Sequence, residues 1–298
     1  MTFRARRSVL YMPGSNARAI EKARSLPVDA VILDLEDSVA PDAKPTARLQ
    51  VVEAISARGF GTRETIVRVN GIDTPWHVDD LTAVAHAAPD AILVPKISTP
   101  QQLESIGQRL LDMHAERRTR VWAMIETPFA LFNVLALAAA AQDSETRLAA
   151  FVMGTNDLAK DTRARIVPGR APMLAWLMNC VAAAHIYGID ILDGVYNDLG
   201  DATGFAQECA EGRNMGFDGK TLIHPSQIEP CNAAFSPSAK EVEEANRIIA
   251  VFDRPENNGK GVVEIDGHMV ERLHAEMARR TLAIAAAIAE RERERRPS

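Results

Sequence analysis

The sequence predicts an α/β protein of the TIM (β/α)8 barrel class with a C-terminal helical extension, and three observations lead to this prediction. Eight short apolar runs occur within the first 225 residues, helix-like segments separate them, and no G-x-G-x-x-G follows an early run. Buried parallel strands read as near-continuous hydrophobic runs, so each run is a predicted strand. The runs are SVLYMP (8–13), VILDLED (31–37), IVRVN (66–70), AILVPK (91–96), VWAMIET (121–127), FVMGTND (151–157), IDILDG (189–194) and KTLIHP (220–225).

The segments between these runs have the character of helices. Several begin at proline and end at glycine, which is the expected asymmetry of helix termini. Strands that alternate with helices form βαβ units and a parallel sheet, and eight units in this length favour a closed barrel over an open sheet. Helical segments of this kind are ARAIEKARS (17–25), KPTARLQVVEAISARG (44–59), PQQLESIGQRLLDMHAERR (100–118) and PMLAWLMNCVAAAHIYG (172–188).

The pattern changes after Pro225, where the rest of the chain is predicted to be mainly helical. We expect a helix near Ser238–Phe252, a polar exposed loop at Arg254–Gly261, the segment GVVEIDG, and a long helix from about His268. The expected domains are therefore a catalytic barrel over residues 1–230 and a helical extension over residues 231–298.

Composition excludes several classes of protein. The chain has 298 residues, 47% of them apolar, a formal net charge of −6 and a pI of about 5.7, which argues against a nucleic-acid-binding protein. No apolar stretch reaches the roughly 20 residues of a membrane span. Cys180, Cys209 and Cys231 form no CxxC pair, and the N-terminus lacks the features of a secretory signal. We therefore expect a cytoplasmic protein with buried thiols and neither membrane nor nucleic-acid partners.

Two acidic residues lie at the ends of neighbouring predicted strands. Glu126 ends the fifth run and Asp157 lies just past the sixth, so their carboxylates can face one another at the end of the barrel where active sites form. Adjacent carboxylates repel unless a cation lies between them, and a hard ion held by few protein oxygens suits Mg²⁺. The alternative is two unrelated surface acids, each in its own salt bridge.

Arg68 ends the third run, where a charge is costly unless it is paired or meets an anionic ligand. Its guanidinium could hold a carboxylate by two hydrogen bonds or stabilise an enolate oxygen. Alternatively it forms a structural pair with Glu36 or Asp37, which end the second run. Both roles are compatible, since an acid can orient an arginine that binds substrate.

The segment Gly14–Asn16 follows the first run and opens a helix whose backbone N–H groups would make a weak anion site. Arg18 and Lys22 add positive charge on this helix, and Lys44 and Arg48 could extend the same patch. The simpler alternative is an ordinary Asn-capped helix with solvated basic residues.

Two further side chains at strand ends invite a chemical interpretation. Lys96 could form a Schiff base, as lysines at barrel strand ends do in some aldolases, although a metal-dependent site would make this unnecessary. His224 is more often a hydrogen-bonded structural histidine than a ligand at such a position. No nucleophile elbow, P-loop or Cys/His nucleophile signature is present.

Taken together, the motifs resemble the citrate lyase β-subunit-like enzymes of the HpcH/HpaI aldolase group, from about residue 7 to about residue 283. Each motif alone is weak, but their combination in this order is specific. The motifs are RSVLYMPGSNARAIEKA, VILDLEDSVAPDAKPTAR, IVRVNGIDTPW, VPKI, MIETPFALFN, GTNDLAKD, GKTLIHPSQI and GKGVVEIDGHMVE.

This resemblance implies a set of ligands and subunit contacts. It implies one Mg²⁺ per subunit on Glu126 and Asp157, substrate binding by Arg68, and a coenzyme A thioester bound near the PGSN helix, with Asn16, Arg18 and Lys22 as contacts. It also implies that Asp266 in the C-terminal extension reaches the active site of a neighbouring subunit in a homotrimer or hexamer.

The implied reaction is carbon–carbon cleavage, or its reverse, of a 3-hydroxy-acid thioester such as malyl-CoA, citramalyl-CoA or citryl-CoA. Arg68 and N–H groups near Gly154 would stabilise the acyl-CoA enolate, and Asp266 would protonate it. Glu36 and Asp37 would position Arg68 or a water, and Thr155 and Asn156 would contact the substrate.

Three alternatives remain open from the sequence. One is hydrolysis of the thioester, with a water delivered by Asp37. A second is a class II pyruvate aldolase that acts on free oxo acids with the same metal pair. The third is a non-catalytic subunit that docks an acyl carrier protein.

Overall fold

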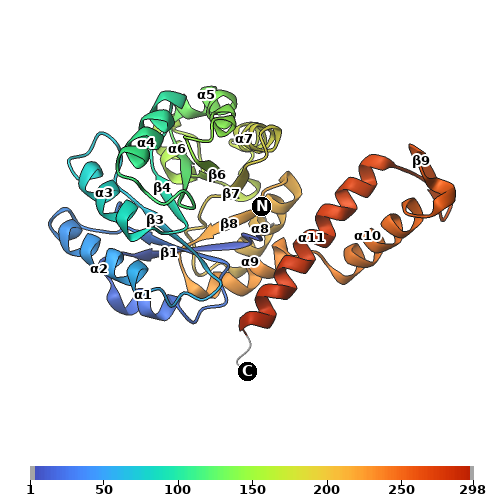
Figure 1. Cartoon of the computed structure of the whole chain (residues 1–298), viewed down its shortest axis with the longest axis horizontal. Coiled ribbons are helices and arrows are strands. Elements are labelled where there is room, and N and C mark those ends of the chain that lie inside the picture. Colours follow the sequence, from blue (N-terminus) through green and yellow to red (C-terminus); the bar gives the residue numbers. More distant parts are fainter. Residues whose placement is uncertain (1–3, 296–298) are drawn as a thin grey trace. The chain divides into compact units, whose positions relative to one another are not determined.

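The computed structural model describes residues 4–295 and contains a closed barrel of parallel strands that follow one another in chain order (Figure 1). The first strand pairs with the last, which closes the barrel. This confirms the predicted fold class. The barrel strands are β1 (Ser8–Pro13), β2 (Ala30–Asp34), β3 (Glu64–Arg68), β4 (Ala91–Val94), β5 (Arg120–Ile125), β6 (Leu148–Met153), β7 (Asp190–Asp193) and β8 (Gly219–Leu222).

Helices surround the barrel, and two of them begin as the sequence suggests. Pro100 and Pro128 are the first residues of their helices, preceded by Thr99 and Thr127 as N-caps. The helices of this part of the chain are α1 (Ala17–Ala23), α2 (Lys44–Ser56), α3 (His77–Ala87), α4 (Pro100–Asp112), α5 (Pro128–Ala139), α6 (Thr155–Thr162), α7 (Leu174–Ile186), α8 (Ala202–Met215) and α9 (Ile228–Phe235).

The barrel strands separate two hydrophobic clusters, because successive side chains of a strand point to opposite faces. Ile32 of β2 belongs to the cluster that fills the barrel, together with Trp122 of β5. Its neighbours Val31 and Leu33 belong to the larger cluster between strands and helices. Burial on both faces explains why the strands read as continuous apolar runs and leaves polar groups mainly at the strand ends.

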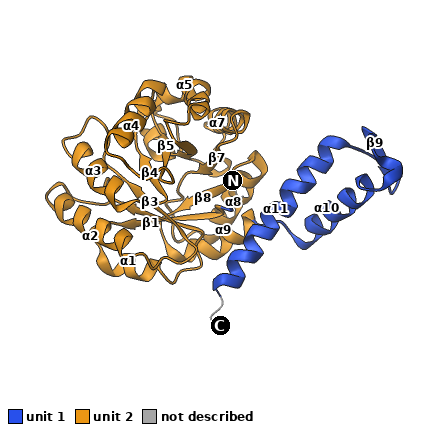
Figure 2. Cartoon of the chain, viewed as in Figure 1, with its two compact units in different colours: residues 1–5, 236–298 blue, residues 6–235 orange. Residues whose placement is uncertain are grey.

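The described residues form two compact units, shown in Figure 2. The barrel unit spans Arg6–Phe235 and therefore includes α9, which lies beyond the expected boundary at residue 230. Cys231 of α9 is fully buried, and its thiol donates to the carbonyl of Arg7, 3.1 Å away. This contact ties the helix to the start of the barrel.

The other unit contains residues 4–5 and 236–295. It consists of α10 (Ala239–Phe252), the antiparallel hairpin β9 (Val262–Ile265) and β10 (His268–Glu271), and α11 (Arg272–Arg295). Phe252, Val263 and Ala275 form its small core. Over the described part of the chain, no helix combines the length and the apolar character that a membrane crossing requires.

The hairpin corrects the prediction of a helix from about His268. Asp266 and Gly267 form the two-residue turn between its strands, both with positive φ, at 50° and 79°. Asp-Gly between alternating strands is a strong hairpin signal, because type I′ turns need positive φ at both central residues. The long helix consequently begins at Arg272.

Candidate active site

A cavity of about 300 Å³ lies at the carboxyl ends of the barrel strands. This is the face on which TIM barrels carry their active sites. Its lining combines methionine, valine and isoleucine side chains with many polar groups. The polar lining residues are Tyr11, Asp34, Asp37, Ser38, Arg68, Glu126, Thr155, Asn156, Asp157, Asn197 and Thr221.

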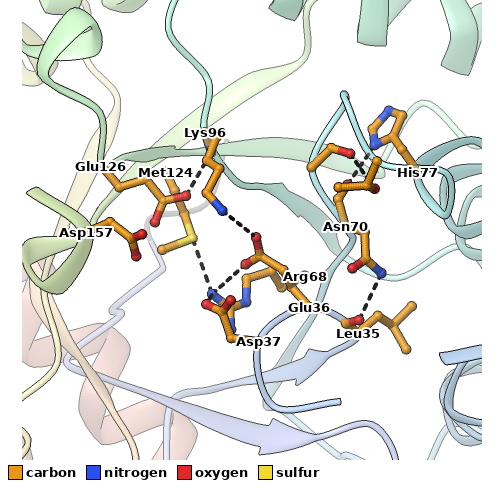
Figure 3. A network of polar contacts seen from close by, with 12 residues as sticks. Leu35, Glu36, Asp37, Arg68, Asn70, His77, Lys96, Met124, Glu126 and Asp157 are labelled. Carbon is orange, nitrogen blue, oxygen red and sulfur yellow. Dashed lines mark hydrogen bonds and ion pairs between the residues drawn. The ribbon is translucent and has the colours of Figure 1, made fainter. Parts of the chain in front are cut away.

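Arg68 is the last residue of β3, and its guanidinium is almost fully buried in this cavity. Asp34 is the last residue of β2 and lies beside Arg68 in the strand register. Arg68 donates two hydrogen bonds to it, from Nε to Oδ1 (2.6 Å) and from Nη2 to Oδ2 (2.7 Å). Nη1 contacts the carboxylates of Glu36 (2.8 Å) and Asp37 (3.2 Å), as Figure 3 shows for these two acids. The expected pairing with Glu36 or Asp37 is present, but Asp34 is the main partner.

Asp34 is the positioning residue that the sequence reasoning missed. Burial alone would raise the pKa of Asp34, but the Arg68 guanidinium, the Ser38 side chain and the Glu36 N–H hold it below its usual range. Its Oδ1 accepts from the Glu36 N–H (2.9 Å) and its Oδ2 from the Ser38 N–H (3.1 Å). Asp34 thus fixes both the arginine and the loop that carries Glu36 and Asp37. The signal was available, because the apolar run VIL already stops at this aspartate.

Glu36 is a buried carboxylate with an elevated pKa. Burial, and repulsion from Asp37, outweigh attraction by Arg68 and Lys96 and raise the pKa of Glu36 to about 7. The Lys96 ammonium lies 3.6 Å from its Oε1. By contrast, the Asp37 side chain is 63% exposed and lines the cavity, so Asp37 is accessible to water while it contacts Arg68.

Glu126 follows β5 directly and is buried, with 2% of its surface exposed. Its Oε1 accepts the backbone N–H of Lys96 (2.8 Å). No lysine, arginine or histidine among residues 4–295 forms an ion pair with it. Burial, followed by repulsion from Glu36 and Asp157, raises the pKa of Glu126 to about 8. The alternative of a surface acid in its own salt bridge is therefore wrong for Glu126.

Asp157 lies in the first turn of α6, and Figure 3 shows its carboxylate turned toward that of Glu126. Among residues 4–295, Asp157 forms an ion pair only with Lys160, an exposed side chain whose Nζ lies 3.5 Å from its Oδ1. An exposed pair of this length contributes little. The structure thus brings Glu126, Asp157 and Arg68 to one cavity, as the sequence predicted.

Gly154, between β6 and α6, creates the space that Glu126 occupies. A Cβ on Gly154 would lie 2.3 Å from the Glu126 Cβ and 2.6 Å from its Oε2. The Gly154 N–H donates to the Ile125 carbonyl (3.0 Å), so it is not available to a substrate. Gly154 therefore contributes room for Glu126, and the expectation that N–H groups near Gly154 stabilise an enolate stays a prediction.

The donor set at Glu126 and Asp157 fits a hard divalent cation. Two carboxylates converge where the described chain supplies Glu126 with no positive partner, and the raised pKa reports that lack of compensation. Among residues 4–295, no group of three or more His, Cys, Asp or Glu side chains is arranged to hold a metal. A closed structural site is thus absent there, whereas Mg²⁺ needs one or two carboxylates and takes water and substrate oxygens besides.

Thr155 and Asn156 begin α6 at the edge of the cavity. The Asn156 and Asn197 side-chain amides form a reciprocal pair, with N···O distances of 3.2 and 2.8 Å. Asn197, in the loop after β7, was not identified from the sequence. Gly194 lets Thr155 approach this loop, since a Cβ there would lie 2.5 Å from the Thr155 Oγ1.

A second buried carboxylate, Asp193 at the end of β7, has a different environment. Arg170 Nη1 donates to both of its oxygens (2.7 and 2.8 Å), and the Lys220 ammonium donates to Oδ2 (3.0 Å). Burial would raise the pKa of Asp193, but Lys220 and Arg170 lower it. Lys220 also donates to Glu208 (2.7 Å). We call Asp193, Arg170, Lys220 and Glu208 the Asp193 cluster.

The basic patch expected beside the first helix is only partly present. Asn16 is the N-cap of α1, and its side chain accepts the Ala19 N–H (3.0 Å), while Arg18 and Lys22 are exposed. Lys44 is buried and donates to the carbonyls of Leu35 and Glu36 and to the Asn70 amide, so it holds the loop that carries Glu36.

Arg48 is likewise not part of such a patch. It pairs with Asp80 at 2.7 Å and with Asp79 at 3.3 Å. Lys44 and Arg48 therefore do not extend a patch around Arg18 and Lys22, and that expectation was wrong for both residues.

The two other candidates at strand ends have no catalytic features. Although burial lowers it, the pKa of Lys96 is raised by Glu36, Glu126 and Asp157, which is the opposite of what a Schiff-base lysine needs. His224 accepts the Ser226 N–H (3.2 Å) as the cap of a short 3-10 helix, consistent with a structural histidine.

Asp266 lies in the C-terminal unit, in the turn of the hairpin, where Arg247 of α10 pairs with its carboxylate. It is thus not among the residues that the barrel brings together at the cavity. Its turn position exposes the side chain, which is 67% accessible.

Comparison with known proteins places the chain among characterised families. The family described as HpcH/HpaI aldolase/citrate lyase matches residues 7–225. The chain is 50% identical over 283 residues to the (3S)-malyl-CoA thioesterase of Cereibacter sphaeroides (strain KD131 / KCTC 12085), covering 95% of both chains. It is 35% identical over 287 residues to the citrate lyase subunit beta of Escherichia coli (strain K12), covering 95% of this chain and 94% of that one.

A solved structure with bound ligands is also similar. It is the crystal structure of protein CitE from Mycobacterium tuberculosis in complex with magnesium, acetoacetate and coenzyme A. The TM-score is 0.76 with 28% sequence identity, and the match covers 95% of this chain and 98% of that chain. The similarity thus extends over both units of the chain.

Proposed function

This chain belongs to the HpcH/HpaI aldolase/citrate lyase family, and from that premise we propose that it is a Mg²⁺-dependent enzyme acting on 3-hydroxyacyl-CoA thioesters of the malyl-CoA type. Such a substrate carries a carboxylate and a hydroxyl on one carbon and a thioester two carbons away. In this proposal, Glu126 and Asp157 would hold the Mg²⁺ that binds the hydroxy-acid end, and the thioester would lie beside Arg68.

One observation carries this proposal. Glu126 is buried, faces Asp157 and has no cationic partner among the described residues, while Arg68 lies in the same cavity with its charge directed by Asp34. A ligand chelated to a divalent ion would supply the positive charge that Glu126 lacks. An electron-rich oxygen of the same ligand could interact with the Arg68 guanidinium. Bound there, Mg²⁺ would polarise the hydroxy-acid oxygens as a Lewis acid.

Arg68 supplies the second half of the chemistry. Its guanidinium is held rigidly by Asp34 and Glu36, and a fixed cation in a buried site stabilises charge that develops on a thioester oxygen. This requirement is shared by two reactions. Attack of water on the thioester carbon gives an oxyanion, whereas carbon–carbon cleavage gives an acyl-CoA enolate.

Hydrolysis is the reaction that similarity favours, because relatives at 50% identity are named (3S)-malyl-CoA thioesterase. Asp37 is suited to assist it: its exposed carboxylate lines the cavity 3.2 Å from Arg68, where it can accept a proton from an attacking water. The second candidate is carbon–carbon cleavage to an oxo acid and an acyl-CoA, which the 35% identity to citrate lyase subunit beta favours.

Two parts of the proposal lie outside the cavity. The exposed Arg18 and Lys22 on α1 would contact the phosphates of coenzyme A. For cleavage, Asp266 of a neighbouring subunit in a homotrimer or hexamer would protonate the enolate carbon, which its exposed position in the hairpin turn permits.

The test is product analysis with malyl-CoA and citramalyl-CoA, with Mg²⁺ and with a chelator. With malyl-CoA, free thiol plus malate indicates hydrolysis, and glyoxylate plus acetyl-CoA indicates cleavage. With citramalyl-CoA, the corresponding products are free thiol plus citramalate, or pyruvate plus acetyl-CoA. We expect turnover only with the metal, and we expect it to disappear in the Glu126→Gln and Asp157→Asn variants. Turnover that survives the chelator or either substitution would contradict the proposal.

A further inference from the structure

Tyr11 is an aromatic side chain of the active-site cavity, and it stacks against Arg68. It lies on β1, and its ring packs on the hydrophobic cluster that fills the barrel. The Arg68 Cζ lies 4.9 Å from the centroid of the Tyr11 ring. A guanidinium over an aromatic ring is attracted to its electron-rich face, so this contact fixes the position of the ring and of its hydroxyl.

The Tyr11 hydroxyl has a weak hydrogen-bond partner. Among residues 4–295, its only hydrogen bond is to the Met124 sulfur, 3.9 Å away. A thioether is a poor acceptor, whereas the hydroxyl of a buried tyrosine usually finds a strong one. Tyr196 shows the difference, since its hydroxyl donates to the Asp201 carboxylate at 2.7 Å. The Tyr11 hydroxyl is therefore available to a better acceptor that enters the cavity.

A second donor approaches the same sulfur atom. Nη1 of Arg68 lies 3.8 Å from the Met124 Sδ, as Figure 3 shows. Tyr11, Arg68 and Met124 belong to three different strands, β1, β3 and β5, and all three line the cavity. The barrel thus directs an O–H donor and an N–H donor to one point. A ligand oxygen beside the Met124 sulfur could accept hydrogen bonds from both.

The surroundings of these donors favour a neutral oxygen over a carboxylate. The Arg68 guanidinium already contacts three carboxylates, so little positive charge remains to attract a ligand anion. These carboxylates belong to Asp34, Glu36 and Asp37. Burial raises the pKa of Tyr11 and outweighs the lowering effect of Arg68, so the hydroxyl stays protonated. Two donors without net positive charge suit a carbonyl oxygen that becomes negative only during the reaction.

We propose that the Tyr11 hydroxyl and the Nη1 of Arg68 together bind the carbonyl oxygen of the substrate thioester, which makes Tyr11 a further catalytic residue. This inference rests on the proposed function, because it takes the thioester to lie beside Arg68. The Met124 sulfur marks the side of the cavity on which the oxygen binds.

The role of Tyr11 is the same in both candidate reactions. In hydrolysis, a water oxygen bonds to the thioester carbon while one water proton passes to Asp37, and the carbonyl electron pair moves onto oxygen. Tyr11 and Arg68 stabilise this oxyanion by hydrogen bonds, and Tyr11 keeps its proton. The carbonyl re-forms as the carbon–sulfur bond breaks, and the thiolate leaves with the proton from Asp37. In carbon–carbon cleavage, the same oxygen carries the enolate charge.

The test is steady-state turnover of malyl-CoA by the full-length Tyr11→Phe protein with saturating Mg²⁺, followed as loss of malyl-CoA so that both reactions are counted. The variant keeps the ring beside Arg68 and removes only the hydroxyl. We expect kcat to fall about 100- to 1000-fold, the effect of losing one donor to an oxyanion. KM should change little, since the hydrogen bond strengthens only in the transition state.

Tyr187→Phe is the matched control, because Tyr187 follows α7 and does not line the cavity. It should retain the wild-type kcat. Calorimetric titration should give Tyr11→Phe the wild-type affinity for Mg²⁺, which separates the loss of an oxyanion donor from a displacement of the metal pair.

A Tyr11→Phe protein with the wild-type kcat would overturn the inference and leave the proposed function intact. A Tyr11→Phe protein whose Mg²⁺ affinity falls in proportion to its kcat would also overturn it, since the residue would then act on the metal site. A wild-type protein without Mg²⁺-dependent turnover of malyl-CoA would instead contradict the proposed function.

Discussion

Two buried carboxylates, Glu126 and Asp193, lie at the carboxyl ends of strands in the same barrel, yet their charges are balanced differently. Arg170 and Lys220 hold both oxygens of Asp193 and lower its pKa. The carboxylate of Glu126 receives one backbone N–H and lies near Asp157 and Glu36, and its pKa is raised to about 8. Side chains of the barrel thus neutralise Asp193, whereas Glu126 has no cationic partner among residues 4–295.

This difference separates structural from functional charge. A buried carboxylate such as Asp193, whose charge is neutralised by arginine and lysine side chains of the chain, has no uncompensated charge to attract a cation. A carboxylate left uncompensated destabilises the protein alone and stabilises a cation that binds there. Burial without a cationic partner among the described residues therefore distinguishes Glu126 from Asp193, and it supports the proposal that Glu126 and Asp157 hold a metal.

The largest expected effect is on activity. Glu126→Gln, which keeps the size of the side chain and removes its charge, should lower Mg²⁺-dependent turnover by about 1000-fold or more, since it removes electrostatic stabilisation from a buried site. Without metal and above about pH 8, where Glu126 is ionised, the same variant should be at least as stable as wild type, because an uncompensated buried charge is gone. Steady-state kinetics measure the loss of turnover, and urea denaturation measures the change in stability. A destabilised Glu126→Gln protein would remove the contrast with Asp193.

The same chemical change at the Asp193 cluster should act on stability. Asp193→Asn leaves Arg170 and Lys220 buried without their acid, and losing one partner of a buried ion pair costs about 3–5 kcal/mol. Equilibrium urea unfolding of the metal-free protein measures this loss. If Asp193→Asn and Glu126→Gln had similar free energies of unfolding, the two carboxylates would not differ as we describe.

A smaller effect is expected from Gly154→Ala. The added Cβ would lie 2.3 Å from the Glu126 Cβ, so the glutamate must move. Overpacking of this kind costs about 1–3 kcal/mol, and a displaced ligand should weaken Mg²⁺ binding by about tenfold or more. Titration with Mg²⁺ tests the second effect. Gly261→Ala is a suitable control, since a Cβ there meets no atom within 4 Å and the φ of Gly261 is not in the left-handed region.

The last prediction concerns pH. Because the pKa of Glu126 is raised from 4.5 to about 8 in the folded protein, the folded state holds a proton that the unfolded state releases between these values. Its contribution to stability is present below about pH 4.5 and is lost as the pH rises through about 8. In a chelator, the wild type should therefore lose stability relative to Glu126→Gln across this range. Saturating Mg²⁺ should remove this pH-dependent loss of stability. If the difference in stability between the two proteins did not change with pH, the raised pKa of Glu126 would be contradicted.

Much of the architecture could be predicted because burial on both faces imprints a simple pattern on barrel strands. The runs ending at Arg68 and Glu126 match strands β3 and β5 to within a residue or two at their carboxyl ends. The hairpin of β9 and β10 was missed, although its Asp266-Gly267 turn is a local signal, because a short strand beside a long helix is easily absorbed into the helical pattern.

The site was predictable at the level of residues but not of pairings. Glu126, Asp157 and Arg68 were identified because charge at the end of an apolar run is conspicuous. Which acid holds Arg68 depends on strand register, and the register places Asp34 beside it. The buried position of Lys44 and the amide pair of Asn156 with Asn197 arise from contacts between distant segments, which composition and spacing do not encode.

The most direct test of the account is a crystal structure of the protein grown with Mg²⁺ and oxaloacetate. We predict one ion bound by Glu126 and Asp157, with the oxo acid completing its coordination and Arg68 still paired with Asp34 beside it. An ion bound elsewhere, or a ligand-free cavity in which Glu126 has turned to a protein cation, would contradict the claim that this pair is left uncompensated to bind a metal.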